Sequence, residues 1–179
     1  MDLSERDLVV LARRRYELGR VLAGLVAALL VLPMALASLA GCDRPVATLA
    51  CAAALSLLIA ASVWYGREAG RAVGPGLWAG LPPLMLPLLL GAAQRICAPG
   101  LCLLFPAACV AGGLAGGVLL GWRAARRGEA SVAFWTAASL IATLAGSLGC
   151  LMAGASGLIG MTLGFSAGAL PTIAAARRS

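Results

Sequence analysis

Apolar residues form six long runs along the chain, and short polar or basic stretches separate them. A transmembrane helix needs roughly 20 mostly apolar residues, and each run has about that length. No Asp, Glu, Arg or Lys lies within any run. The predicted transmembrane helices lie at about residues 21–40, 46–65, 77–93, 102–122, 132–149 and 151–173. The fold class expected from this pattern is an all-α integral membrane protein, a bundle of six transmembrane helices.

The composition supports this class. Of 179 residues, 61% are hydrophobic and only 12% are charged, whereas a soluble domain is usually nearer half apolar and a quarter charged. The loops between the runs are short, so we expect one transmembrane domain over residues 21–176 without an inserted soluble domain. Residues 1–20 remain as an amino-terminal helix, and residues 177–179 remain as a tail.

The basic residues lie almost entirely on one side of this six-span arrangement. All 14 are arginine, and only Arg44 and Arg95 fall on the opposite side. Because cytoplasmic loops carry an excess of basic residues, both termini are predicted in the cytoplasm. Indole rings prefer the headgroup level, and four tryptophans fall at predicted cytoplasmic span ends: Trp64, Trp78, Trp122 and Trp135. The net charge of +7 therefore reflects orientation in a lipid bilayer, and no direct nucleic-acid partner is expected.

Residues 1–20 have the pattern of a helix start. Ser4 is a candidate N-cap with Asp7 three residues on, and Arg13 can pair with Glu17 at i, i+4. One face of this helix is formed by Leu8, Leu11, Ala12 and Tyr16. The segment is either a cytoplasmic extension of the first span, held at the headgroups by its arginines, or a docking helix for a cytoplasmic partner. The two interpretations are compatible.

Small and helix-breaking residues mark three of the runs. Glycines recur at every fourth position in two stripes, which are Gly113, Gly117 and Gly121 in the fourth run and Gly160, Gly164 and Gly168 in the sixth. Such stripes let helix backbones approach closely, and we favour packing within one chain, with a homodimer as the alternative. The third run contains Pro82, Pro83 and Pro87, so neighbouring groups must satisfy the carbonyls that these prolines free.

The sequence argues against an enzyme. It has no histidine, which removes the commonest general acid–base group, and it contains no nucleotide-binding, zinc-protease or Ser-His motif. No cofactor is expected. The uncharged spans also argue against proton-coupled transport, which uses ionisable groups inside the membrane. The alternative functions are a small transporter or channel for a neutral or soft-metal solute, and a structural subunit of a membrane complex.

All the cysteines are predicted in the outer half of the bilayer or just above it: Cys42, Cys51, Cys97, Cys102, Cys109 and Cys150. Compartments outside the cytoplasm are oxidising, so thiols there tend to pair. Cys97 and Cys102 bracket a Pro99-Gly100 turn, which brings their ends together. A disulfide between these two residues is our first choice.

Two other interpretations of the cysteines stay open. Thiolates favour copper(I), zinc and similar soft metal ions, and the ligands of such a site would be Cys42, Cys97, Cys102 and Cys150. Cysteine can also act as a small apolar residue. Cys109 lies deeper than the others and is expected to pack in the core, unless it meets Cys51.

The segment Leu39-Ala40-Gly41-Cys42 resembles a bacterial lipoprotein signal. Cleavage there would make the first run a signal peptide and Cys42 a lipid anchor. The region before the run is long and partly acidic, however, and the run has the length of a full span. We therefore interpret it as a transmembrane helix.

Four short motifs mark the second half of the chain: Cys102-Leu103-Leu104-Phe105-Pro106, Arg126-Arg127-Gly128-Glu129-Ala130, Gly149-Cys150 and Arg177-Arg178. In these motifs the chain resembles the NrsF-type anti-sigma factors, bacterial inner-membrane proteins with six spans and a short cytoplasmic amino terminus. The resemblance implies a cysteine at each of two outer positions, here Cys102 and Cys150. It also implies that the amino-terminal segment holds an extracytoplasmic-function sigma factor, with contact candidates Leu8, Leu11, Ala12, Arg13 and Tyr16.

The function expected from these features is negative regulation of transcription from the membrane. Outer thiols would sense an oxidant or a soft metal in a stress response. The candidate sensing or disulfide residues are Cys97, Cys102, Cys150 and Cys42. Rearranged spans would then change how residues 1–20 hold the sigma factor.

Overall fold

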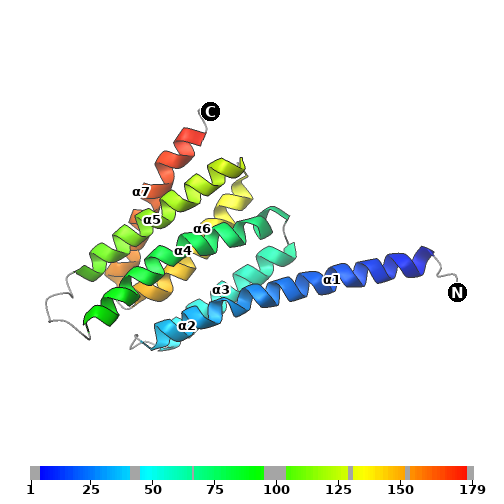
Figure 1. Ribbon diagram of the computed structural model, residues 1–179, viewed down its shortest axis with the longest axis horizontal. Coiled ribbons are helices and arrows are strands. Elements are labelled where there is room, and N and C mark those ends of the chain that lie inside the picture. Colours follow the sequence, from blue (N-terminus) through cyan, green and yellow to red (C-terminus); the bar gives the residue numbers. More distant parts are fainter. Residues whose placement is uncertain are drawn as a thin grey trace.

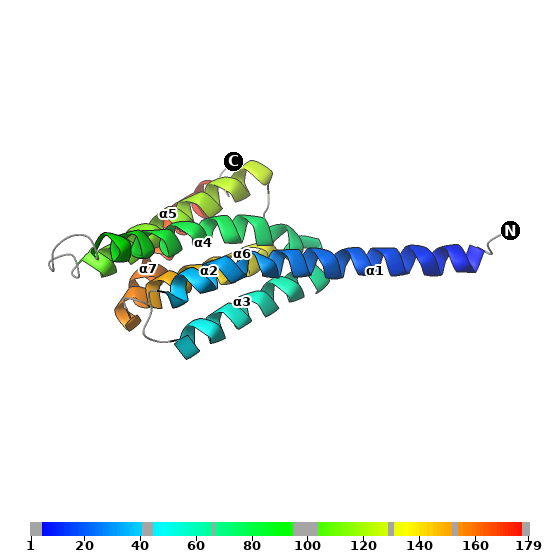
Figure 2. The ribbon, with the colours of Figure 1, turned by 60° about the horizontal axis from the view of Figure 1, so that its bottom comes forward.

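The computed structural model describes residues 5–40, 45–65, 67–94, 104–128, 131–151 and 154–176. In chain order their helices are α1 (Glu5–Leu29), α2 (Val31–Leu39), α3 (Pro45–Tyr65), α4 (Arg67–Gln94), α5 (Leu104–Arg127), α6 (Val132–Cys150) and α7 (Gly154–Ala176). Helices α1 and α2 follow one another across Leu30, whose N–H donates to the carbonyl of Val26 at 3.3 Å. They form one nearly continuous rod, the blue element of Figures 1 and 2.

Five helical segments of the described chain are long and apolar enough to cross a membrane. They are Arg13–Leu39, Pro45–Trp64, Glu68–Gly91, Pro106–Arg127 and Val132–Cys150. Large apolar side chains on them point outward, and Leu25, Leu57 and Leu140 are more than half exposed. A continuous apolar surface of this kind matches a lipid environment. The prediction of an all-α, multi-pass membrane protein is confirmed as far as the length and apolar character of these helices are concerned.

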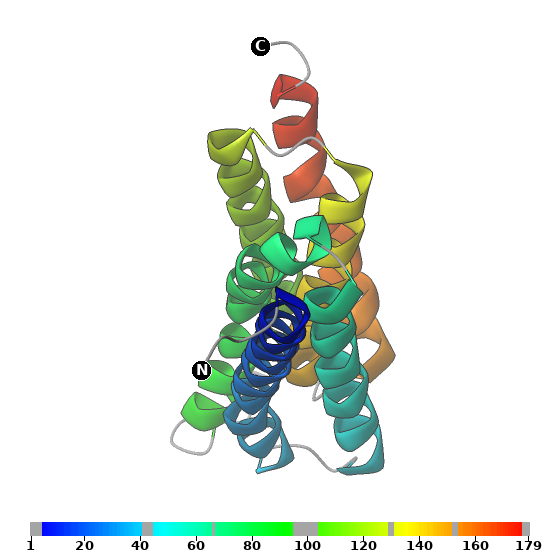
Figure 3. The same cartoon turned by 90° about the vertical axis from the view of Figure 1, so that its right-hand side faces the viewer.

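Successive rods run in opposite directions, so the helix termini gather at two opposite ends of the bundle (Figure 3). One end, called here the thiol end, contains Leu39, Pro45, Gln94, Leu104, Cys150 and Gly154. The opposite end, called the arginine end, contains Tyr65, Arg67, Arg127, Val132 and Ala176. In Figure 3 the ends of α5, α6 and α7 that belong to the arginine end are at the top.

Helix α4 is central to the packing, because it contacts α3, α5 and α6. Glycines on α4 allow the close contact with α6. A Cβ on Gly76 would lie 2.9 Å from the carbonyl oxygen of Ala138, and a Cβ on Gly80 would lie 2.6 Å from the Cβ of Ala145. Because glycine has no Cβ, the two helix backbones can lie side by side at these positions.

The two predicted glycine stripes lie against each other where α5 packs along α7. A Cβ on Gly117 would collide with the carbonyl oxygen of Phe165, and a Cβ on Gly164 would collide with that of Val110. The glycines with close neighbours in the partner helix are Gly113, Gly117, Gly121, Gly160, Gly164 and Gly168. These faces are therefore occupied by each other within one chain.

Helix α4 begins at Arg67, ten residues before the predicted third span at 77–93. The stretch before residue 77 contains Gly74 and Pro75, which are weak helix formers and made this region resemble a loop. Ala72 nevertheless has an exposure of 0% in the bundle. Tertiary packing therefore outweighs the local propensity in this stretch.

Four prolines lie inside α4, and each leaves the carbonyl four residues earlier without its helical donor. Pro83 frees the carbonyl of Ala79, and Pro87 frees the carbonyl of Pro83. The Ala79 oxygen lies against Gly116 of α5, and the Pro83 oxygen accepts from the Cys150 sulfur of α6 at 3.7 Å. The neighbouring helices therefore cover the groups that the prolines release, as a proline-containing span requires.

Candidate functional site

Three of the predicted sensing cysteines lie outside the described residues: Cys42, Cys97 and Cys102. The predicted bridge between Cys97 and Cys102 lies outside them as well. The described cysteines all carry free thiols, and they are Cys51, Cys109 and Cys150. The first is half-buried on α3, and the other two are buried.

Cys109 and Cys150 lie together in the interior of the bundle. The two residues and Met161 pack together in one buried cluster. The exposures of these three residues are 0%, 0% and 2%. Helices α5, α6 and α7 thus contribute one sulfur-containing side chain each, and we call this group the three-sulfur cluster.

The partner of Cys109 differs from the one considered in the sequence. Cys109 is buried, as predicted, but it meets Cys150 and not Cys51. Helix α5 packs mainly on α4 and α7, whereas α3 packs on α1, α4 and α6. Cys51 consequently borders a separate core cluster that contains Leu55 and Leu148. The sequence did not indicate which helices are neighbours.

A glycine makes room for the sulfur of Met161. A Cβ on Gly146 would lie 2.6 Å from the Met161 sulfur and 2.8 Å from the Cγ of Pro83. Gly146 precedes Cys150 by one helical turn on α6, so both residues face the same neighbours. The cluster therefore occupies a space that α6 leaves open with a glycine.

The cluster is connected to the proline-containing part of α4 through Cys150. The Pro83 carbonyl has no helical donor because the residue four positions on is Pro87. The Cys150 thiol supplies a weak donor to that carbonyl, with a sulfur–oxygen distance of 3.7 Å. The spacing of these two prolines signals a free carbonyl in the sequence, but it does not indicate which group will reach it.

The predicted partner-binding face lies on α1, which runs past the end of the bundle (Figure 2). Leu11 and Tyr16 have exposures of 49% and 60%, and the side chain of Arg13 has an exposure of 80%. Leu8 and Ala12 belong to α1, but their side chains are outside the described part of the chain. The described members of the face are thus accessible to a partner.

The predicted pair between Arg13 and Glu17 is confirmed, with a nitrogen–oxygen distance of 3.2 Å. Where α1 passes the end of α3, these two residues line a cavity of about 320 Å³ together with Tyr16 and Trp64. The rod of α1 and α2 therefore meets α3 at the arginine end through aromatic and charged side chains.

Arginines also cover tryptophan rings at this end. The guanidinium carbon of Arg123 lies 5.1 Å from the centroid of the Trp78 ring, and that of Arg126 lies 3.9 Å from the Trp122 ring. Such contacts contribute about 0.5–1 kcal/mol at exposed sites. They keep two arginines and two indoles at one level of the bundle, although Trp78 lies well inside the long helix α4.

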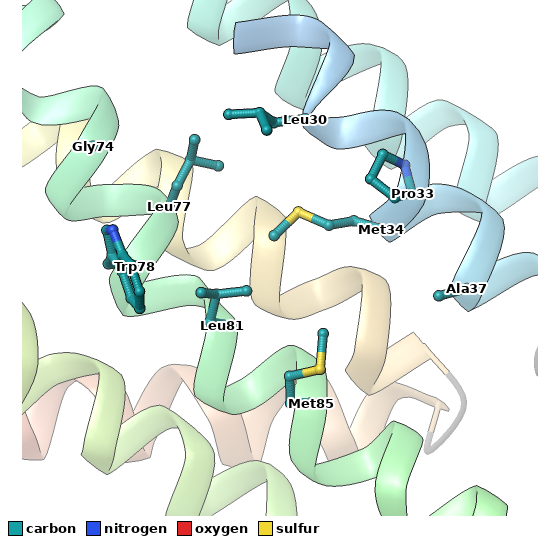
Figure 4. A pocket seen from close by; sticks show the side chains of 9 residues that line it. All are labelled: Leu30, Pro33, Met34, Ala37, Gly74, Leu77, Trp78, Leu81 and Met85. Atoms are coloured by element: carbon teal, nitrogen blue, oxygen red, sulfur yellow. The ribbon is translucent and has the colours of Figure 1, made fainter.

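An apolar cleft of about 490 Å³ lies between the α1–α2 rod and α4 (Figure 4). It is lined by Leu30, Pro33, Met34, Ala37, Gly74, Leu77, Trp78, Leu81 and Met85. The indole nitrogen of Trp78 is the only polar side-chain atom among these residues. The cleft suits an apolar chain such as a lipid tail, and it presents no group that could carry out chemistry.

Within the described residues, no three side chains of the His, Cys, Asp and Glu types come together as a metal centre. In comparisons of the chain with protein families, curated proteins and solved structures, none matches. The function must therefore be inferred from the residues and their arrangement.

Proposed function

We propose that this protein is a membrane-bound anti-sigma factor, a negative regulator that holds an extracytoplasmic-function sigma factor through its amino-terminal segment. An oxidant or a soft metal would act on cysteines near the thiol end. The observation that carries the proposal is the division of the molecule. An exposed helix, α1, leaves the bundle at the arginine end, and thiols gather toward the other end. The resemblance of the motifs around Cys102 and Cys150 to the NrsF-type family supports the same function.

In this proposal the arginine end faces the cytoplasm of a bacterial inner membrane. The described basic residues near that end include Arg71, Arg123, Arg126 and Arg127, and cytoplasmic ends carry the excess of basic residues. Helix α7 then supplies the sixth span, and both termini are cytoplasmic. The thiol end faces the oxidising side, where thiol chemistry is favoured.

The hydrogen bond between Cys150 and Pro83 supports a route for the signal. A two-electron oxidant such as a peroxide would take two electrons and two protons from a pair of thiols as their disulfide forms. Chemistry that removes the Cys150 proton, or draws its sulfur away, leaves the Pro83 carbonyl without a donor, which is costly in an apolar interior. This cost favours a different packing of α4 against its neighbours, in which the Pro83 carbonyl finds another donor. Because α4 contacts α3 and α3 contacts α1, the change can reach the partner-binding helix.

Deletion of residues 2–16 tests the holding function. The deletion should release the sigma factor and raise transcription from its target promoter to the level of a strain that lacks the regulator. A promoter reporter in living cells measures this, with membrane levels of the shortened protein checked by immunoblotting. Unchanged transcription at normal protein levels would contradict the proposal.

A matched set of substitutions sharpens the test. Leu11→Glu and Tyr16→Glu place a charge on the predicted face, and Val10→Glu places the same charge off that face on an equally exposed residue. The first two should weaken sigma-factor binding by more than about 10-fold, since apolar anchors of an interface contribute roughly 2 kcal/mol or more. Val10→Glu should leave binding unchanged. Equal effects from all three changes would argue against a specific face.

The sensing function has its own test. Cys102→Ser and Cys150→Ser should each abolish the change in reporter output after addition of an oxidant or a soft metal. Cys51→Ser is the matched control and should respond like the natural protein, because Cys51 borders a different core cluster. An unaltered response in the first two variants would remove the sensing role of these cysteines.

The transport alternative has less support in the described part of the chain. The apolar cleft between the α1–α2 rod and α4 would be filled by lipid tails. Solute uptake by proteoliposomes that contain the purified protein distinguishes a transporter from a regulator.

A further inference from the structure

The three-sulfur cluster joins the softest donor groups that proteins possess in one buried place. Cys109, Cys150 and Met161 come from three different helices, and they are almost completely buried. We propose that these three residues form a binding site for a monovalent soft metal ion of the copper(I) and silver(I) class. The inference names a ligand for the thiol chemistry of the proposed function, and it rests on that function for its biological meaning.

The donor set selects this class of ion. Thiolate and thioether ligands favour copper(I) over the harder cations, which prefer oxygen. A structural zinc site requires four ligands in a tetrahedral arrangement, and the described residues supply three. Copper(I) and silver(I) accept two or three sulfur ligands, so the cluster provides a complete set for them.

The charge balance of the buried site supports a monovalent ion. When one ion binds, one thiol gives up its proton to water, and a sulfur–metal bond takes the place of the sulfur–hydrogen bond. The charge lost with the proton equals the charge of the ion, so the site stays neutral. This matters because a net charge in an apolar interior is very costly. The second thiol and the thioether complete the coordination as neutral donors.

The fold fixes the position of one donor and leaves a short path to the cluster. The Met161 sulfur packs directly against Gly146, where a Cβ would come within 2.6 Å of it. Cys150 is the last residue of α6, and Cys109 lies five residues into α5 from Leu104, which is about 8 Å at 1.5 Å per residue. An ion that arrives from the thiol end therefore crosses only one or two helical turns to reach the cluster.

The decisive experiment uses full-length protein in which only the two clustered cysteines remain. The background carries Cys42→Ser, Cys51→Ser, Cys97→Ser and Cys102→Ser, is reduced, and is purified in lipid nanodiscs. Silver(I), which undergoes no redox change here, is titrated calorimetrically. Copper(I) is measured in competition with a coloured chelator. We expect one ion per chain and one proton released for each ion, and X-ray absorption of the copper(I) form should show three sulfur neighbours.

Single substitutions in this background identify the ligands. Cys109→Ser and Cys150→Ser should each weaken binding by more than about 100-fold, beyond the range typical of residues that only support a ligand. Met161→Leu should weaken it by about 10-fold. The matched control Met85→Leu, which makes the same change in the apolar cleft, should leave the affinity unchanged. If a serine variant does not fold, Cys109→Ala and Cys150→Ala, which keep these positions apolar, serve in its place.

Several results would overturn the site. They are the absence of metal binding in the two-cysteine background, full affinity after the loss of either cysteine, and equal behaviour of Met161→Leu and Met85→Leu. Because this titration contains no sigma factor, its outcome is separate from that of the proposed function. If metal binds but does not affect sigma-factor release, the metal site stands and its regulatory role is contradicted. If the amino-terminal deletion releases the sigma factor but no metal binds, the proposed function stands and the metal site is contradicted.

Discussion

The later spans of the bundle bury about twice as much of their length as the first two. In Pro106–Arg127 and Val132–Cys150, 50% and 56% of the most apolar window is buried, against 27% and 28% in Arg13–Leu39 and Pro45–Trp64. The later spans pack on their neighbours through glycine and alanine, as where Gly80 of α4 meets Ala145 of α6. The earlier ones turn large side chains such as Leu57 outward. In a membrane, therefore, small residues mark the packed interface, and the largest apolar residues mark the lipid-facing surface.

This difference suits a regulator that has a fixed part and a responsive part. The tightly packed helices α5, α6 and α7 hold the three-sulfur cluster in one geometry. The less buried rod of α1 and α2 has fewer restraints, and it carries the proposed partner-binding face. Helix α4 contacts both α3 and the later helices, so it links the two parts.

The largest expected effect comes from removing a large buried side chain from the tightly packed later helices. Phe134 has an exposure of 0% and an edge-on contact with Trp135 at 6.2 Å between ring centroids. Phe134→Ala should lower the free energy of unfolding by about 3–5 kcal/mol, because it leaves a cavity. Leu57→Ala on the lipid-facing side of α3 should change it by no more than about 0.5 kcal/mol. Denaturant unfolding in micelles, followed by circular dichroism, measures both, and similar losses would contradict the contrast between the two parts.

A smaller effect is expected from one methyl group added to a glycine. Gly117→Ala should lower the free energy of unfolding by about 1–3 kcal/mol, because the new Cβ meets the backbone of Phe165 and overpacks the α5–α7 contact. Gly74→Ala is the control, since nothing lies within 4 Å of its Cβ position. That change should be neutral or stabilise by up to about 1 kcal/mol through helix propensity. Thermal unfolding of both variants in the same detergent gives the comparison, and a stable Gly117→Ala protein would mean that the two helices are not held this closely.

The smallest effect is expected on the exposed rod. The Arg13 and Glu17 side chains are 80% and 53% exposed, so their ion pair is largely screened by solvent. Arg13→Gln should lower stability by only a few tenths of a kcal/mol, and about 1 M salt should remove the difference. Unfolding of both proteins at low and high salt measures this. A loss above about 1 kcal/mol would show that α1 is held more firmly than its exposure indicates.

The predictable part of the fold came from features that repeat along the chain. Runs of apolar residues located the spans, and the glycine stripes marked two faces that do pack closely. The predicted third span began too late, because Gly74 and Pro75 concealed a helix that starts at Arg67. Local propensity cannot report that Ala72 will be covered by neighbouring helices. The candidate site was predicted only in part. The sequence points to Cys150 as a sensing residue, but it predicts Cys109 as a packing residue and gives no signal for Met161.

The sequence by itself determined that this chain forms helices long and apolar enough to span a membrane, because hydropathy and length are properties of each segment alone. It also separated a basic end from a cysteine-bearing end, since these follow from counting spans. Only the tertiary structure decided which helices are neighbours. That choice depends on how the small residues of separate helices fit together, and it brought Cys109 against Cys150 and the thiol of Cys150 to the carbonyl of Pro83.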